Sequence, residues 1–297
     1  MAMGLLSKFF ILSSLCILVS TGRSAAMTCS NPPKIQTKAI WLPHPTETPK
    51  AIILIGHGLN MRASAMDKLG TVLNQKGHFH TLRLTLSGHD GDTDAFKAVT
   101  HDRWQQDFFY QYCEARTQAD FFHVPLYFVG FSLSGIVGLD SMEYENEVRF
   151  DRMALLAPPA AIWPLVHFMK LLRVLGRDHM IQSFAEPSYR ANMDGTSVAA
   201  YLSMFESISA YRESQGKHSK IPTLIIMDPE DELVSLDGLK RLANDFNLSN
   251  DWNFLEVTNT DTKLKKSYHH FITDDVALGD QEFERLVKAI ADHFLGL

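Results

Sequence analysis

The residues most clearly suited to catalysis surround Ser132. Residues 126–135 read Leu-Tyr-Phe-Val-Gly-Phe-Ser-Leu-Ser-Gly. A run rich in β-forming side chains ends at Gly130, and a pattern typical of a helix follows the serine. A serine at the apex of such a tight turn has a strained backbone, so its neighbours must be small. Gly130, Ser134 and Gly135 meet that requirement. The spacing predicts that Ser132 is presented as a nucleophile.

The elements on either side of this turn must position it. Short apolar runs that end at Gly, Ser or Pro predict strands, and runs of helical spacing lie between them. The predicted strands cover residues 35–42, 51–55, 79–86, 149–156, 223–227 and 253–258. One more predicted strand begins at Pro125 and leads to Ser132. The predicted helices cover residues 61–75, 102–119, 236–246 and 281–295, besides the helix after Ser132. This alternation implies right-handed crossovers and a mainly parallel sheet with helices on both faces.

Together these features resemble the α/β-hydrolases, in particular esterases, monoacylglycerol lipases and lysophospholipases. The resemblance covers nearly everything after residue 26, and it implies the α/β-hydrolase fold over residues 27–297. Residues 56–60, Gly-His-Gly-Leu-Asn, resemble the family's His-Gly-x signature. Residues 83–91 resemble its Arg-x-x-x-x-Gly-His-Gly turn, although Asp90 stands between His89 and Gly91. Trp104-x-x-Asp107 matches a common position on the next helix. Ser134 departs from the pattern, because this position is usually glycine.

The resemblance also implies the partners of Ser132. A serine hydroxyl needs a base to take its proton and a carboxylate to orient that base, and this fold supplies them in the order Ser, Asp or Glu, His. The acid position after strand 223–227 matches Asp231, which precedes Glu-Leu-Val; Asp228 and Glu230 are the fallbacks. The base position before the last helix matches His270, in preference to the adjacent His269.

An oxyanion hole completes the implied site. Its two donors are the backbone N–H of Leu133, directly after the nucleophile, and the N–H of Leu59 in the His-Gly loop. His57 is expected to brace that loop rather than to transfer protons. The implied activity is that of a serine hydrolase that cleaves carboxylic esters through an acyl-enzyme. The alternatives are thioester or amide cleavage on the same triad, or a binding protein that keeps the fold without catalysis.

Residues 160–219 interrupt the alternation and contain no strand pattern. Residues 163–175 are strongly apolar and residues 198–211 are helical in pattern, so an insertion of this length should carry its own structure. In α/β-hydrolases a helical cap commonly enters here, and its apolar members Trp163, Phe168, Met169 and Leu172 suggest a lipophilic acyl group. The alternative is a pair of ordinary scaffold helices.

Composition narrows the partners further. The net charge of −6 argues against a nucleic-acid partner. The expected partner is a small-molecule or lipid ester, with transient membrane contact through the cap. Residues 90–94, Asp-Gly-Asp-Thr-Asp, mimic the start of a calcium loop, but Ala95 and His101 stand where that loop needs glycine and an acid. We therefore expect neither a metal nor a cofactor.

The N-terminus has the pattern of a secretory signal. Lys8 precedes an apolar run over residues 9–19, and small residues at 24–26 suit cleavage. We expect residues 1–26 to be a signal peptide and the protein to be secreted or periplasmic; the alternative is an uncleaved membrane anchor. Cys29 and Cys113 could then form a disulfide, although the helical pattern around Cys113 favours a buried free thiol.

Overall fold

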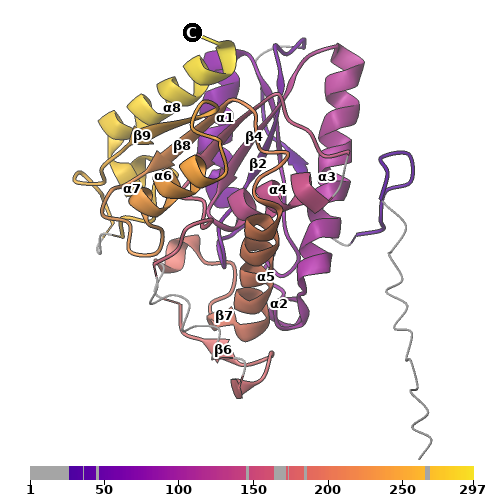
Figure 1. Cartoon of the computed structure of the whole chain (residues 1–297), viewed down its shortest axis with the longest axis vertical. Helices are drawn as coiled ribbons and strands as arrows, with labels where there is room; N and C mark the ends of the chain where they lie inside the picture. Colours follow the sequence, from indigo (N-terminus) through magenta and orange to yellow (C-terminus); the bar gives the residue numbers. More distant parts are fainter. Residues whose placement is uncertain are drawn as a thin grey trace, which may run out of the picture.

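A seven-stranded sheet with the strand order β1-β3-β2-β4-β5-β8-β9 organises the molecule (Figure 1). The computed structural model describes residues 27–35, 37–44, 47–144, 147–163, 172, 174–183, 186–264 and 268–297. The strands are β1 (Ile40–Trp41), β2 (Ile52–Gly56), β3 (His80–Arg83), β4 (Leu126–Phe131), β5 (Arg152–Leu156), β8 (Thr223–Met227) and β9 (Trp252–Glu256). Only β1 is antiparallel to its neighbour in this sheet. The predicted mainly parallel sheet is confirmed.

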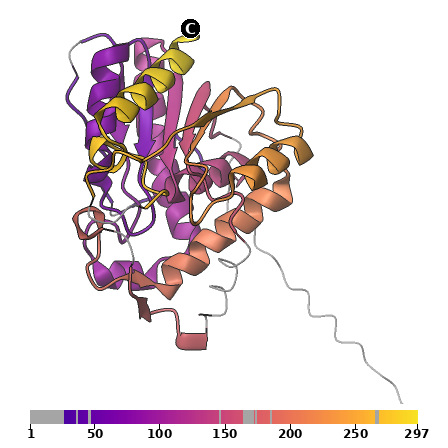
Figure 2. The same cartoon turned by 90° about the vertical axis from the view of Figure 1, so that its left-hand side faces the viewer.

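The central strands are apolar because both of their faces are covered. Every residue of β2, β4 and β8 is buried, as expected for parallel strands between two helical layers. The helices are α1 (Asp67–Gly77), α2 (Thr93–Ala98), α3 (His101–Phe122), α4 (Leu133–Tyr144), α5 (Val198–Ser214), α6 (Leu236–Asp245), α7 (Asp275–Leu278) and α8 (Asp280–Leu295). Helices α1 and α8 pack together, while α3 and α4 pack together on the other face of the sheet (Figures 1 and 2).

Several elements differ from the sequence prediction; strand β5, for example, begins at Arg152 and not at residue 149. Strand β1 is a two-residue piece of the run predicted at residues 35–42. Strand β3 ends at Arg83 instead of Leu86, because the N–H groups of Thr85 and Leu86 leave the ladder and donate to side chains of other elements. The helix predicted at residues 61–75 begins as a 3₁₀ turn (Ala63–Met66) and continues as α1.

The predicted insertion contains a small sheet that the sequence analysis did not foresee. Strands β6 (Met180–Ile181) and β7 (Thr196–Ser197) pair antiparallel, with a 3₁₀ turn (Pro187–Tyr189) between them. Two-residue strands are too short to produce an alternating pattern, so the prediction of no strand here was wrong. Helix α5 lies close to the predicted 198–211 and packs on α4. Of the apolar run 163–175, residues 164–171 and 173, with Phe168 and Met169, lie outside the described residues.

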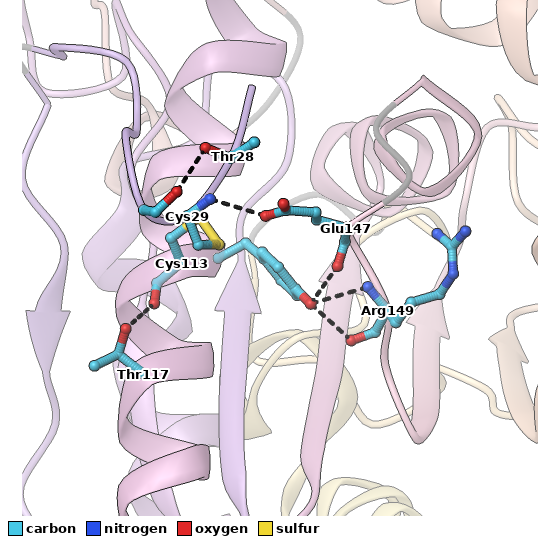
Figure 3. The surroundings of a disulfide bond; sticks show 8 residues. Thr28, Cys29, Cys113, Thr117, Glu147 and Arg149 are labelled. Atoms are coloured by element: carbon cyan, nitrogen blue, oxygen red, sulfur yellow. Dashed lines mark hydrogen bonds between the residues drawn. A yellow bond between two sulfur atoms is a disulfide. The ribbon is translucent and has the colours of Figure 1, made fainter. Parts of the chain in front are cut away.

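A disulfide bond between Cys29 and Cys113 fastens the N-terminal segment to α3 (Figure 3). Their Cα atoms are 5.2 Å apart, and the Cys29 N–H donates to the Glu147 carboxylate at 2.8 Å. Cys113 is therefore a bonded cysteine and not the free thiol that its helical pattern favours. The predicted signal, residues 1–26, lies outside the described residues. No helix in the described ranges is long and apolar enough to cross a membrane.

Candidate active site

Ser132 stands at the turn between β4 and α4 in a left-handed backbone conformation, with φ of 47°. Its N–H donates to the Leu156 carbonyl on the neighbouring strand at 2.8 Å, which fixes the turn. A Cβ atom added to Gly130 would lie 2.7 Å from the Cα of Gly135, so the strand and helix can meet only because Gly130 lacks a side chain. This close approach explains the small residues that mark the motif.

Ser134 uses the hydroxyl that replaces the usual glycine. Its Oγ donates to the His57 carbonyl at 2.6 Å, and its N–H donates to the same carbonyl at 3.1 Å. The side chain fits because Gly56 faces it; a Cβ atom on Gly56 would lie 2.4 Å from the Ser134 Cβ. Ser134 thereby joins α4, the helix that follows Ser132, to the loop that follows β2.

Ser132, His270 and Asp231 form one hydrogen-bonded row. The Ser132 Oγ lies 2.9 Å from His270 Nε2, and His270 Nδ1 lies 2.8 Å from Asp231 Oδ2. All three residues are buried, with Ser132 and His270 only 6% and 7% exposed. The row can accept a proton from the serine and stabilise the imidazolium that results.

The Asp231 side chain is held by its own loop. Its Oδ1 accepts the N–H groups of Leu233 and Val234, each at 2.8 Å, which leaves Oδ2 to face the histidine. The indole N–H of Trp163 donates to the Asp231 carbonyl at 3.0 Å. The carboxylate therefore has one orientation, set by the backbone that follows β8.

The electrostatics of the row favour a histidine that binds a proton readily. Burial by itself lowers the pKa of His270, but the adjacent Asp231 carboxylate, aided by Glu232, outweighs burial and raises the pKa above its ordinary value. A base with this environment takes up the serine proton more easily than an isolated histidine would.

The loop after β2 lies against Ser132. A Cβ atom on Gly58 would lie 3.5 Å from the Ser132 Cβ and 2.7 Å from the Phe131 ring, so glycine is required there. Within the described residues, the N–H groups of Leu59 and Leu133 donate to no protein acceptor. Both predicted oxyanion donors are thus available to a ligand.

Two buried neutral histidines brace this loop. Burial is the main reason that the pKa of His57 is lowered to about 4, and burial also lowers the pKa of His89 well below its ordinary value. His57 Nε2 accepts the Leu86 N–H at 3.2 Å, and His89 Nε2 accepts the Asn60 N–H at 3.1 Å. His57 therefore serves to hold the backbone of the loop.

A segment of the insertion fastens both sides of the site, and no sequence pattern indicates this role. The Asn60 side chain donates to the carbonyls of Asn192 and Gly195 at 3.2 and 3.0 Å, and accepts the Asn192 N–H at 2.8 Å. The Tyr189 hydroxyl donates to the Asp274 carboxylate at 2.8 Å, shortly after the histidine loop. These contacts join residues far apart in the chain, so no local pattern could reveal them.

The alternative acid and base candidates, Asp228, Glu230 and His269, contact one another beside the row of Ser132, His270 and Asp231. His269 Nδ1 lies 2.9 Å from Asp228 Oδ2, and His269 Nε2 lies 3.5 Å from the Glu230 carboxylate. Burial lowers the pKa of His269, but the carboxylates of Asp228, Glu232 and Glu230 raise it, and the net shift is upward. The structure joins His270, and not His269, to the Ser132 hydroxyl.

The run that resembles a calcium loop, residues 90–94, leads into helix α2. Asp92 is the N-cap of α2, and its side chain accepts the Ala95 N–H at 2.9 Å. Across the described ranges, no group of three or more His, Cys, Asp or Glu side chains is arranged to hold a metal ion.

Several solved structures share this architecture. The monoacylglycerol lipase of Paleococcus ferrophilus is 16% identical, with a TM-score of 0.61 over 87% of this chain and 100% of its own. A soluble variant of the Saccharomyces cerevisiae monoglyceride lipase, bound to a substrate analogue, is 11% identical, with a TM-score of 0.69 over 91% and 95%. A thermostable carboxyl esterase from Bacillus coagulans is 13% identical, with a TM-score of 0.63 over 88% and 94%. No protein-family model and no curated protein matches the sequence.

The strand order, the parallel sheet and the likeness to these structures agree on one architecture. The chain has the α/β-hydrolase fold, which confirms the fold class predicted from its sequence.

Proposed function

We propose that this protein is a serine hydrolase that cleaves carboxylic esters. The observation that carries the proposal is the row from Ser132 through His270 to Asp231, with hydrogen-bond distances of 2.9 and 2.8 Å. The N–H groups of Leu59 and Leu133, which donate to no acceptor among the described residues, support it, because ester cleavage needs donors for the negative oxygen of the tetrahedral intermediate.

The reaction follows from the roles of these atoms. The Ser132 Oγ attacks the ester carbonyl while His270 Nε2 takes the hydroxyl proton, and the carbonyl oxygen becomes an anion between the Leu59 and Leu133 N–H groups. When the intermediate collapses, the ester C–O bond breaks and His270 gives its proton to the departing alcohol. The acyl-enzyme at Ser132 is then hydrolysed by water that His270 deprotonates, which releases the acid.

We propose a lipophilic monoester, such as a monoacylglycerol or lysophospholipid, as the substrate class. Two of the similar structures are lipases of monoacylglycerol or monoglyceride type, and one of them holds a substrate analogue. The Trp163 ring supports the choice, because it is 43% exposed and its indole N–H reaches the loop that bears Asp231. Transient contact of the insertion with a membrane surface would deliver such a substrate.

We also propose export from the cytoplasm, with cleavage after residue 26. The signal-like pattern of residues 1–26 supports this, and so does the Cys29–Cys113 disulfide, since such bonds persist in oxidising compartments.

The test of function is turnover of p-nitrophenyl esters of increasing chain length by the wild type and by Ser132→Ala. We expect hydrolysis by the wild type with an optimum at medium chain length, and no hydrolysis by a Ser132→Ala variant that still folds. Equal hydrolysis by both proteins would refute the role of Ser132. Hydrolysis of thioesters or amides without ester turnover would keep the triad and replace the substrate class.

A further inference from the structure

The carboxylate of Glu232 holds the backbone that carries the proposed base. Its Oε1 accepts the N–H of His269 at 3.0 Å, and its Oε2 accepts the N–H of His270 at 3.1 Å. We infer that Glu232 is a positioning residue for His270, an inference that rests on the proposed ester hydrolysis. Its role is to hold the histidine backbone so that Nε2 reaches the Ser132 hydroxyl.

The pairing matches the chemistry of both partners. Two consecutive N–H groups need two acceptors side by side, and an ionised carboxylate offers two equivalent oxygens in that arrangement. Among the described residues, the N–H groups of His269 and His270 donate to no other acceptor. An amide at position 232 would accept one N–H and present its own NH₂ group to the other.

One loop makes all these attachments. Residues 228–234 supply Asp231 to His270 Nδ1, Glu232 to the backbone of both histidines, and Asp228 to His269 Nδ1. The loop is itself rigid, because Asp231 Oδ1 accepts two of its N–H groups. The orientation of His270 and the position of its backbone therefore derive from the same short segment.

Glu232 also contributes charge at this site. Among the residues that the structure describes, the charged groups around His270 are Asp231 and Glu232 from the acid loop, together with the neighbouring group of His269 with Asp228 and Glu230. The groups on its other side, Ser132 and the ring of Phe131, are uncharged. Asp231 first and then Glu232 raise the pKa of His270 against the effect of burial. Loss of the Glu232 charge should lower that pKa, whereas a purely structural residue would leave it unchanged.

Glu230 provides a matched control. It is exposed, it lies two residues earlier in the same loop, and its carboxylate faces His269 Nε2 rather than the backbone of His270. Glu232→Gln and Glu230→Gln remove the same charge from the same loop, and only the first removes an acceptor from the catalytic histidine's backbone.

The experiment measures kcat/KM against pH for the wild type and both variants with a short-chain p-nitrophenyl ester. We expect Glu232→Gln to lower kcat/KM roughly tenfold, since small misplacements of a catalytic group are costly. We also expect its acid limb to move to lower pH, while Glu230→Gln stays within about twofold of the wild type with an unmoved limb. A Glu232→Gln profile that matches Glu230→Gln would overturn the inference.

A second variant keeps the test decisive if Glu232→Gln does not fold. Glu232→Asp keeps the charge but is one methylene shorter, so it should lose kcat/KM while its acid limb stays at the wild-type pH. Wild-type values of both quantities in Glu232→Asp would overturn the inference. A folded wild type that hydrolyses no ester would instead refute the proposed function, so the two failures are distinguishable.

Discussion

Replacement of Asp231 by asparagine should nearly abolish activity through the tautomer of His270. Asp231 Oδ1 accepts the N–H groups of Leu233 and Val234, and Oδ2 faces His270 Nδ1 at 2.8 Å. An asparagine in this place keeps its oxygen on the two N–H groups, so its NH₂ group must face Nδ1. The ring proton then moves to Nε2, where it points at the Ser132 hydroxyl. A histidine in that tautomer cannot accept the serine proton.

The size of the loss has two sources. Unit charges about 4 Å apart attract by about 4 kcal/mol at an effective dielectric constant of about 20. Loss of that stabilisation for the imidazolium formed in the transition state slows the reaction about 10³-fold. The wrong tautomer adds to this loss, and the same change in a serine protease triad costs about 10⁴. We therefore expect kcat to fall by about 10³–10⁴ at neutral pH.

The assay is kcat for a p-nitrophenyl ester, with the thermal unfolding midpoint as a check on folding. Asp228→Asn is the matched control, because Asp228 pairs with the adjacent His269 through the same kind of contact. We expect that control to keep most of the wild-type kcat, because Asp228 contacts His269 and not His270. An Asp231→Asn protein that folds and keeps a tenth of the wild-type kcat would refute the role given to this carboxylate.

Three further perturbations test other parts of the structure. The double variant Cys29→Ser/Cys113→Ser removes the disulfide between residues 84 positions apart. Because the unfolded chain gains conformational entropy, we expect the unfolding free energy to fall by about 4–5 kcal/mol. Urea unfolding measures this loss, and unchanged stability would contradict it. The wild-type kcat/KM should fall with decreasing pH around a midpoint above about 6.5, because the base must be neutral and the pKa of His270 is raised; a pH profile with a midpoint below that value would count against it. Asn60→Asp removes the donor to the carbonyls of residues 192 and 195. We expect kcat to fall roughly tenfold, because the loop that carries the Leu59 N–H loses its attachment. A wild-type kcat in this variant would show that the loop needs no such attachment.

The seven-stranded sheet could be predicted because its main strands are short apolar runs that can be recognised from neighbouring residues alone. Strand β8 was predicted to the residue, since an apolar run between Pro222 and Asp228 must be buried on both faces. The motif at Ser132 is also local, because its geometry demands small residues at fixed offsets. The position of Asp231 after that strand follows from the chain order of the fold.

The attachments that hold the site could not be predicted in this way. Glu232 meets the histidine backbone across 37 and 38 positions, and Asn60 meets Asn192 across 132. In the sequence, a loop glutamate such as Glu232 indicates only a solvated side chain, and it is exposed in the structure. An asparagine such as Asn60, whose φ is 51°, indicates only a turn. Such contacts depend on tertiary packing and leave no periodic pattern in the sequence.

The cysteines and the calcium-like run illustrate the same limit. The helical pattern of Cys113 predicts burial correctly, at 5% exposure, but burial does not decide between a thiol and a disulfide. Asp92 sits in a run of acids because it caps the six-residue helix α2, which is too short to show helical spacing.

The proposed role of Ser132 is tested by the intact mass of the folded protein after treatment with a fluorophosphonate, followed by peptide mapping. We expect one covalent adduct, located on Ser132, and none on a folded Ser132→Ala variant. An unlabelled wild type, or an adduct that persists in Ser132→Ala, would contradict the claim that Ser132 is the activated nucleophile.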